Sequence, residues 1–298
     1  MIAIQKSFED KPGSRGKLYL VATPIGNLED MTYRAVRVLQ EADIIAAEDT
    51  RQTRKLLTHF EISPGKLFSY HEHNKAASGP ELIRFIIEGK NLALVSDAGL
   101  PAISDPGSDL VKLAIEADIP VIPVPGANAA LSALIVSGLS TERFQFVGFL
   151  PRDNKERDAL LASLKQEENT LLLYESPHRL IKTLEALFKA WGDRNIVLAR
   201  ELTKRYEEMA RGSLSECLAW LEEHPPLGEY CLVVAGARPE EVKEMKDAWW
   251  QPLSVEEHVR HYEMQEGCAR KEAMKKAAAD RGVSKREIYK IIAVDDKE

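Results

Sequence analysis

Residues 95–111, VSDAGLPAISDPGSDLV, combine carboxylates with turn-forming residues directly after the apolar stretch NLALV. A short apolar run that ends in Gly, Pro and Asp is typical of a strand leaving a parallel sheet, where open α/β folds bind ligands. Asp97 and Asp105 can accept hydrogen bonds from ribose hydroxyls or from an ammonium group. In the alternative interpretation, Asp97, Asp105 and Asp109 only cap turns and the following helix.

The ligand expected at this position is not a phosphate group. The sequence contains no GxxxxGK[ST] motif and no GxGxxG motif after a strand pattern. Carboxylates beside the turn would also repel a phosphate. A loop that cradles phosphate is therefore not expected.

Charged residues also follow the second apolar run, in the stretch AAEDTRQTRKL. Because the carboxyl ends of parallel strands share one edge of a sheet, Glu48, Asp49 and Arg51 are expected on the side where Asp97 emerges. Charged groups above apolar strands are candidates for acid–base or positioning roles. The alternative is that Asp49 or Thr50 only caps a helix.

The stretch SYHEHNK offers His71 and His73, but no cysteine or third ligand accompanies them, so no metal site is predicted. These histidines are expected to line a polar rim. Residues 51–75 mix cations with Phe60, Phe68 and Tyr70, a pattern that is typical of surfaces that bind single-stranded nucleic acid.

Loops farther along the chain supply additional candidates. Pro24 and Gly26, in ATPIGNLEDMT, would let the backbone approach a flat ligand closely. Tyr174, at the end of TLLLYES, can hold an adenine face or can be a core residue, and Lys204 follows another strand in ARELTKRYEE. No nucleophile elbow and no HExxH motif occurs, so a hydrolase is not supported.

Apolar runs of strand length alternate with helical patterns from residue 17 onward, which predicts βαβ units and mostly parallel sheets. Strands are expected at 17–23, 43–49, 66–70, 91–97 and 120–126, and then at 144–150, 170–176, 195–201, 206–214 and 229–236. The predicted organisation is a disordered leader (1–16), an N-terminal α/β domain (17–126), a C-terminal α/β domain (127–236), a linker (237–252) and a helical domain (253–298).

The helical tail contains a basic segment, although the whole chain is acidic. Gly282 supplies a turn, and Ser284 with Glu287 forms a capping box for a second helix, which together predict a helix-turn-helix. Residues 268–290 hold eight Lys or Arg against three Asp or Glu. This segment is either a contact surface for nucleic acid or a solvated helical hairpin.

The composition bears on the partners of the protein and on the compartment in which it acts. The 298 residues carry 40 basic and 47 acidic side chains, a net charge of −7, so a polyanionic partner must be met by a local basic patch. Cys217, Cys231 and Cys268 form no CxxC pair, which favours a reducing cytoplasm over a disulfide framework. No apolar run approaches the ~18 residues of a membrane span, so no membrane partner is expected.

Long motifs follow one another in order along the chain: GKLYLVATPIGNLEDMTYRAVRVLQEADIIAAEDTRQTRKLL, SYHEHN, VSDAGLPAISDPGSDLV, PVPGANAALSAL, FVGFLPR, YESPHRL and GEYCLVVAG. Together they resemble the tetrapyrrole-methylase-like (class III) methyltransferases and, within them, the ribosomal RNA small subunit methyltransferase I family. The resemblance spans residues 17 to about 236, and the tail is similar to that family's helix-turn-helix domain.

The resemblance implies two tandem α/β domains with S-adenosylmethionine in the cleft between them. It also implies a homodimer that methylates a cytidine ribose 2′-OH in the decoding region of 16S rRNA, with the small ribosomal subunit as substrate. The cofactor-binding residues that it implies are Pro24, Asp97, Gly99, Leu100, Ile103, Ser104, Asn128, Ala129, Tyr174, Gly228 and Glu229.

Methyl transfer to a neutral hydroxyl needs a group that accepts its proton or stabilises the forming alkoxide. Glu48 or Asp49 is the candidate base, and Arg51 and Lys204 are candidate partners of a phosphate or oxyanion. Two other hypotheses remain open: a tetrapyrrole-type small-molecule methyltransferase and a non-catalytic regulator that senses S-adenosylmethionine. The turn SDAGLP, where other tetrapyrrole methylases have GDP, disfavours a porphyrin-like substrate, and the basic tail favours RNA.

Overall fold

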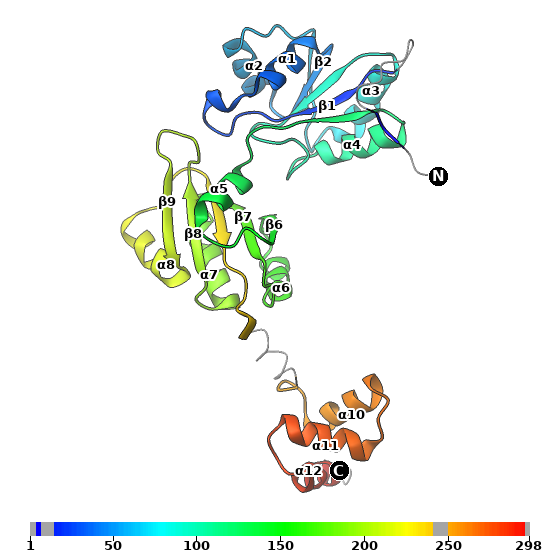
Figure 1. Cartoon of the computed structure of the whole chain (residues 1–298), viewed down its shortest axis with the longest axis vertical. Helices are drawn as coiled ribbons and strands as arrows, with labels where there is room; N and C mark the ends of the chain where they lie inside the picture. The colour runs from blue at the N-terminus through cyan, green and yellow to red at the C-terminus, as the bar shows by residue number, and fades with distance from the viewer. Residues whose placement is uncertain (1–3, 7–14, 241–249, 296–298) are drawn as a thin grey trace. The chain divides into compact units, whose positions relative to one another are not determined.

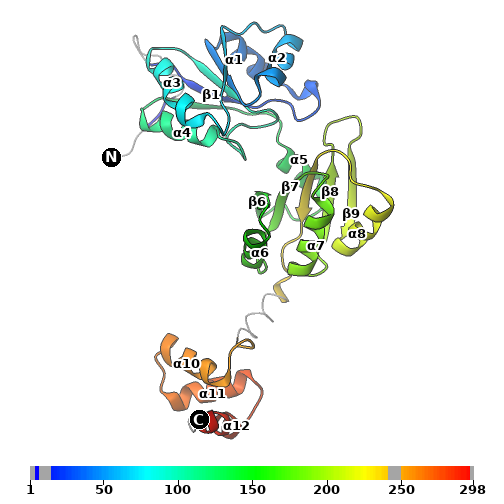
Figure 2. The same ribbon diagram turned by 180° about the vertical axis from the view of Figure 1, so that it is seen from behind.

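The computed structural model describes residues 4–6, 15–240 and 250–295. The chain forms two compact units, one containing both sheets and the other containing the C-terminal helices (Figures 1 and 2). Most of the predicted leader and residues 241–249 of the predicted linker lie outside the described residues. Within the leader, Gln5 pairs through its side-chain amide with both backbone groups of Val121, at 2.9 Å each.

The first sheet is entirely parallel, as the alternation of strands and helices predicts. Its strand order is β3-β2-β4-β1-β5, so β2 and β4 are neighbours and their carboxyl ends lie together. The strands are β1 (Leu18–Val21), β2 (Ile44–Ala47), β3 (Lys66–Ser69), β4 (Leu92–Val95) and β5 (Val121–Val124).

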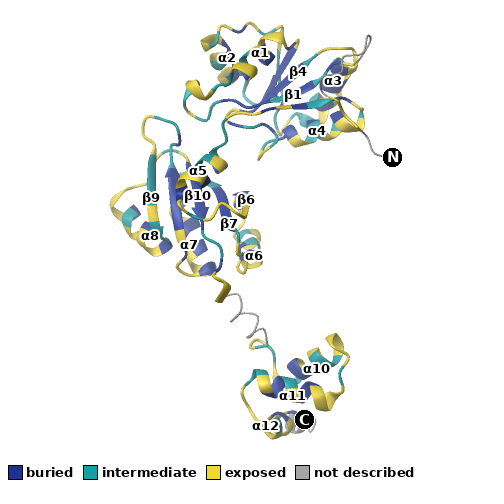
Figure 3. Ribbon diagram, viewed as in Figure 1, coloured by how far each residue is buried: buried dark blue, intermediate teal, exposed yellow. Residues whose placement is uncertain are grey.

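Helices cover both faces of this sheet, which explains why the inner strands β2 and β4 are apolar and buried throughout rather than alternating. Ile44 and Ala46 pack in one cluster with α3 and α4, whereas Ile45 and Ala47 pack in another with α1 and α2. Figure 3 shows the buried strands between these helices. The helices are α1 (Tyr33–Glu41), α2 (Thr50–His59), α3 (Lys75–Ile87) and α4 (Gly107–Glu116), with a short 3₁₀ turn, η1 (Leu28–Asp30), before α1.

The second sheet has each of the expected strands but is not mostly parallel, so that expectation was wrong for this half. Its order is β6-β7-β10-β8-β9, and only the pair β6–β7 is parallel. The short connection between β8 and β9 permits only an antiparallel hairpin, because a parallel pair needs a long crossover. The strands are β6 (Phe144–Phe149), β7 (Thr170–Glu175), β8 (Asn195–Arg200), β9 (Glu208–Ser213) and β10 (Tyr230–Val234).

The chain passes from the first sheet to the second through α5, which packs against β7, β8 and β10. Asn128 caps this helix by accepting a hydrogen bond from the backbone N–H of Leu131 at 2.9 Å. Farther on, α7 contacts both α6 and α8. The helices of this half are α5 (Ala129–Ser137), α6 (Asn154–Ser163), α7 (Leu180–Trp191) and α8 (Leu214–Glu223).

The C-terminal unit contains the predicted helix-turn-helix, preceded by a further helix. Gly282 has φ +63°, and Ser284 and Glu287 form the predicted capping box, with the Ser284 N–H donating to Glu287 at 2.7 Å. His258 is fully buried and its ring bonds Asp280 at 3.0 Å and Arg281 at 3.1 Å. The helices are α10 (Val255–Gln265), α11 (Arg270–Asp280) and α12 (Lys285–Asp295). Among the described helices, none has the length and apolar character to cross a membrane.

Candidate functional site

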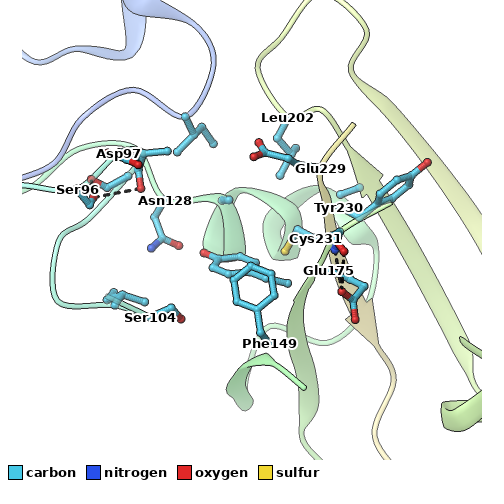
Figure 4. Close-up of a pocket in the computed structure, with 18 of the residues that line it drawn as sticks. Ser96, Asp97, Ser104, Asn128, Phe149, Glu175, Leu202, Glu229, Tyr230 and Cys231 are labelled. Carbon is cyan, nitrogen blue, oxygen red and sulfur yellow. Dashed lines mark hydrogen bonds between the residues drawn. The ribbon is translucent and has the colours of Figure 1, made fainter. Parts of the chain in front are cut away.

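A cavity of about 500 Å³ is lined by loops from both sheets of the first unit. The first sheet contributes residues that follow the carboxyl ends of β1, β2 and β4, including Ile25, Glu48 and the stretch 96–100. The second sheet contributes the ends of β7 and β8 and the start of β10. In Figure 4, Asp97 and Asn128 lie on one side of the cavity and Phe149 and Cys231 on the other.

Three carboxylates, from Glu48, Asp97 and Asp105, lie at the side formed by the first sheet. Asp97 accepts a hydrogen bond from the backbone N–H of Asp49 at 3.0 Å, which joins the ends of β4 and β2. Asp105 accepts from the backbone N–H groups of Ala102 at 2.9 Å and Gly107 at 2.7 Å. This part of the cavity therefore suits a ligand group that is cationic or that donates hydrogen bonds.

The proton affinities of two of these carboxylates are raised. Burial, followed by the charges of Asp97 and Asp105, raises the pKa of Glu48 above its ordinary value. Burial also raises the pKa of Asp105, although three backbone N–H groups oppose this effect. A carboxylate with a raised pKa is a stronger base than an exposed one, which is the property that a general base needs.

The loop between β4 and α4 is held in an unfavourable backbone conformation. Ala102 and Ser104 adopt φ of 70° and 65°, a region that non-glycine residues rarely occupy. Gly99, with φ 79°, exchanges two backbone hydrogen bonds with Thr23, at 2.9 and 3.0 Å. Such strained residues cluster at binding sites, where the surrounding structure holds them in place.

Part of the side formed by the second sheet is apolar and aromatic. The ring of Tyr174 lies 5.6 Å from that of Phe149 and 5.1 Å from that of Phe146, in edge-to-face arrangements. The hydroxyl of Tyr174 accepts a hydrogen bond from the backbone N–H of Ala130 at 3.3 Å, which fixes the ring beside α5. Burial raises the pKa of the Cys231 thiol to about 12, so this side chain acts as an apolar wall.

Lys204 lies at the cavity edge between two carboxylates. Its Nζ donates to Glu201 and to Glu229, each at 2.8 Å. Burial lowers the pKa of Lys204, but these two hydrogen bonds outweigh burial and hold the pKa above its ordinary value. Lys204 is thus a permanent cation with one ammonium donor left for another partner.

Loops from the two halves of the unit contact each other beside Lys204. The backbone N–H of Asn27 donates to the Thr203 hydroxyl at 3.1 Å. A Cβ at Gly26 would lie 2.3 Å from Cγ of Lys204 and 3.1 Å from the carbonyl oxygen of Leu202. Glycine is therefore required at position 26 for this close approach of the two loops.

The structure brings most of the predicted cofactor-binding residues into this one cavity. Pro24 and Gly228 do not line it, although each is adjacent in sequence to a residue that does, Ile25 and Glu229. The predicted residues that line the cavity are Asp97, Gly99, Leu100, Ile103, Ser104, Asn128, Ala129, Tyr174 and Glu229.

Several apolar residues of the lining, including Phe149, Leu202 and Cys231, are not among the residues predicted from the sequence. These residues lie in or beside strand-like patterns, where an apolar side chain cannot be distinguished from a core residue by periodicity.

The four candidate catalytic residues are placed differently from one another. Glu48 and Lys204 line the cavity, whereas Asp49 and Arg51 do not. Asp49 caps α2 and binds the Arg51 guanidinium through both carboxylate oxygens, at 2.8 and 3.1 Å. Hydrogen bonds from the side chain and backbone of Arg51 lower the pKa of Asp49 to about 2, which makes Asp49 a weak base.

The predicted aromatic surface in residues 51–75 is supported only in part, because its three rings pack against the core to different extents. Tyr70 is buried, with its hydroxyl donating to the carbonyl oxygen of Pro106 at 3.3 Å. Phe68 packs edge-to-face on Phe85, with ring centroids 6.5 Å apart, and Phe60 packs against the core beneath α1 and α2. Tyr70 is therefore closed to bases, whereas Phe60 and Phe68 are partly buried against the core.

Comparison with known proteins fits this arrangement. A family model described as tetrapyrrole (corrin/porphyrin) methylases matches residues 17–218. The chain belongs to this methyltransferase family. It is 56% identical over 287 residues to "Ribosomal RNA small subunit methyltransferase I" of Halalkalibacterium halodurans, covering 96% of this chain and 98% of that protein. The protein of the same name from Bacillus subtilis is 53% identical over 289 residues, covering 97% of this chain and 98% of that protein.

A solved structure of the family has the same fold. The crystal structure of uroporphyrin-III-C-methyltransferase from Thermus thermophilus matches with a TM-score of 0.53 at 25% identity, covering 78% of this chain and 97% of that one. The predicted fold of two α/β halves of the tetrapyrrole methylase type, followed by C-terminal helices, is therefore confirmed.

Proposed function

We propose that this methyltransferase uses S-adenosylmethionine to methylate the ribose 2′-OH of a cytidine in the decoding region of 16S rRNA. The relatives named for small-subunit ribosomal RNA, which match nearly the whole chain, support the choice of RNA as substrate. The observation that carries the proposed chemistry is the position of Glu48, a cavity carboxylate with a raised pKa.

The cavity residues fit S-adenosylmethionine. A volume of about 500 Å³ is in the ordinary range for small-molecule sites. Asp97 and its neighbouring carboxylates suit the cofactor's ribose hydroxyls and positive charges, and Asn128 and Ser104 add polar groups. Phe149, Tyr174 and Leu202 provide an apolar wall for the adenine.

Bound S-adenosylmethionine supplies a methyl group on a positively charged sulfur. The residues of this chain then have two tasks: to orient the 2′-oxygen in line with the methyl carbon, and to take its proton. As the new O–C bond forms and the C–S bond breaks, Glu48 accepts the hydroxyl proton. Lys204, with one free donor, binds a nearby phosphate or the partial charge on the oxygen.

The test uses methyl-labelled S-adenosylmethionine and small ribosomal subunits that lack the modification. We expect label in 16S rRNA, recovered after alkaline hydrolysis as an alkali-stable dinucleotide, because a 2′-O-methyl group blocks cleavage at that ribose. Label in a tetrapyrrole would support the small-molecule alternative. Cofactor binding without transfer would support a regulator.

We also propose that the C-terminal unit contacts the RNA. Within residues 268–290 of this unit, Arg281 bonds backbone carbonyls at Leu253 and Ser254, and Lys276 pairs with Glu266. The cations that remain exposed in this segment are Arg270, Lys271, Lys275, Arg286 and Lys290. These cations outnumber the exposed carboxylates of the same segment, which supports a basic surface that binds a polyanion.

We further propose that the protein acts as a homodimer in the cytoplasm. Strand β6 is an edge of the second sheet, and large apolar side chains of β6 and α5 are exposed. Apart from Phe149, which lines the cavity, these are Leu131, Ile135, Val136, Phe144 and Phe146. Large apolar side chains left exposed on neighbouring elements of this half support an interface there. Sedimentation velocity should give twice the chain mass, and the double substitution Ile135→Asp and Phe144→Asp should give the monomer mass.

A further inference from the structure

The loop between β8 and β9, residues 201–207, carries an exposed aromatic ring and also contributes residues to the cavity lining. Tyr206 is 64% exposed, and the guanidinium carbon of Arg205 lies 5.6 Å from the centroid of its ring. Glu201, Leu202 and Lys204 of the same loop line the cavity. In sequence, Tyr206 is two residues from Lys204, and both belong to the loop of the β8–β9 hairpin (Figure 1).

The shape of this loop is fixed by contacts that do not involve the ring. Glu201 and Thr203 have φ of 49° and 65°, and Thr203 is held by its N–H donating to Glu207 at 2.6 Å. The Glu201 N–H donates to the carbonyl oxygen of Glu229, and the Glu229 N–H returns a hydrogen bond to the Glu201 carboxylate, at 2.9 Å each. A strained loop that is fixed in advance, with its aromatic tip in solvent, is arranged for binding rather than for packing.

The chemistry of the tip is that of a base-stacking surface. Single-stranded RNA places unstacked bases on tyrosine rings and on guanidinium planes, and this contact tolerates any base. A target nucleotide whose hydroxyl enters a recessed cavity leaves its neighbouring base without one stacking partner. Residues 51–75, which the sequence also suggests for this role, offer no ring as exposed as that of Tyr206, because Tyr70 is buried and Phe60 and Phe68 are partly buried.

We propose that Tyr206, backed by Arg205, is the platform on which a base next to the target nucleotide stacks. This inference rests on the proposed RNA methylation and assigns the single-stranded RNA segment beside the target to the β8–β9 loop.

Three variants at one position test the proposal: Tyr206→Phe, Tyr206→Leu and Tyr206→Ala. Tyr206→Leu keeps an apolar side chain but removes the ring, so it is the matched control for stacking. We expect the KM for unmethylated small subunits to rise about fivefold or more in the Leu and Ala variants, and to stay near the wild-type value in the Phe variant. Affinity for S-adenosylhomocysteine, measured by calorimetry, should be unchanged in all three, which a merely structural role of the ring would not give.

A second measurement identifies what the ring touches. A photo-crosslinking residue, p-benzoylphenylalanine, replaces Tyr206 in the full chain, which is irradiated with unmethylated small subunits. A crosslink to 16S rRNA supports the platform, and a crosslink to a ribosomal protein alone, or none, overturns it. Wild-type kinetics in Tyr206→Leu would also overturn it. If instead the wild-type protein transfers no methyl group to the RNA, the proposed function itself fails.

Discussion

Replacing Glu48 by glutamine should abolish most of the methyl transfer while making the protein more stable at neutral pH. Glutamine keeps the size of the side chain but cannot accept the hydroxyl proton. A general base contributes about 10²- to 10⁴-fold in rate, so kcat should fall by that factor, which is about 2.7–5.4 kcal/mol of activation free energy.

The stability change follows from the direction of the pKa shift. Burial, with Asp97, Asp105 and Asp49 nearby, raises the pKa of Glu48, and the charge of His71 opposes this only in part. A carboxyl whose pKa is raised on folding favours the folded state at low pH, and that contribution is lost as pH rises through the folded-state pKa. At pH 7 the ionised Glu48 therefore costs stability, and Glu48→Gln should raise the melting temperature at pH 7 but not at pH 4.

One assay measures single-turnover methylation of unmethylated small subunits between pH 5 and 8. A second assay measures thermal unfolding at pH 7 and at pH 4. The wild-type rate should fall as pH drops through the pKa of Glu48, and this decline should begin at a higher pH than for an ordinary glutamate. Asp49→Asn is the matched control, because Asp49 does not line the cavity and asparagine still caps a helix. A rate within tenfold of wild type in Glu48→Gln, or a loss of activity in Asp49→Asn as large as in Glu48→Gln, would refute the assignment.

Three further outcomes are expected. Asp97→Ala should weaken cofactor binding by about 1.5–3 kcal/mol through loss of a charge-assisted hydrogen bond, without unfolding the chain, and unchanged affinity in a calorimetric titration would contradict its role. Removing residues from Gln251 onward should leave cofactor binding intact but reduce methylation of small subunits, and equal rates for both proteins across a range of salt would make the tail a solvated bundle. Unmethylated small subunits should be methylated faster than a decoding-region oligonucleotide at physiological salt, because a chain of net charge −7 holds a flexible strand by few phosphate contacts. Comparable initial rates on the two substrates would contradict the preference for the assembled small subunit.

The sequence by itself determined the structural elements that depend on residues close together in the chain. The parallel first sheet follows from alternating strand and helix patterns, and the helix-turn-helix follows from Gly282 and the Ser284–Glu287 capping box. The meeting of Asp97 with the end of β2 was also predictable, because parallel strands end at one edge. The two residues joined there, Asp49 and Asp97, are 48 positions apart.

Tertiary structure alone decided how the candidate residues divide between the cavity and its surroundings. Glu48 and Asp49 are adjacent in sequence, yet one lines the cavity and the other binds Arg51, because side-chain direction at a strand end depends on the turn that follows. Cys231 and Leu202 became cavity walls only when the second sheet was placed opposite the first. Periodicity reports which residues avoid water but not what covers them, so the apolar half of a binding site is indistinguishable from core until the chain is folded.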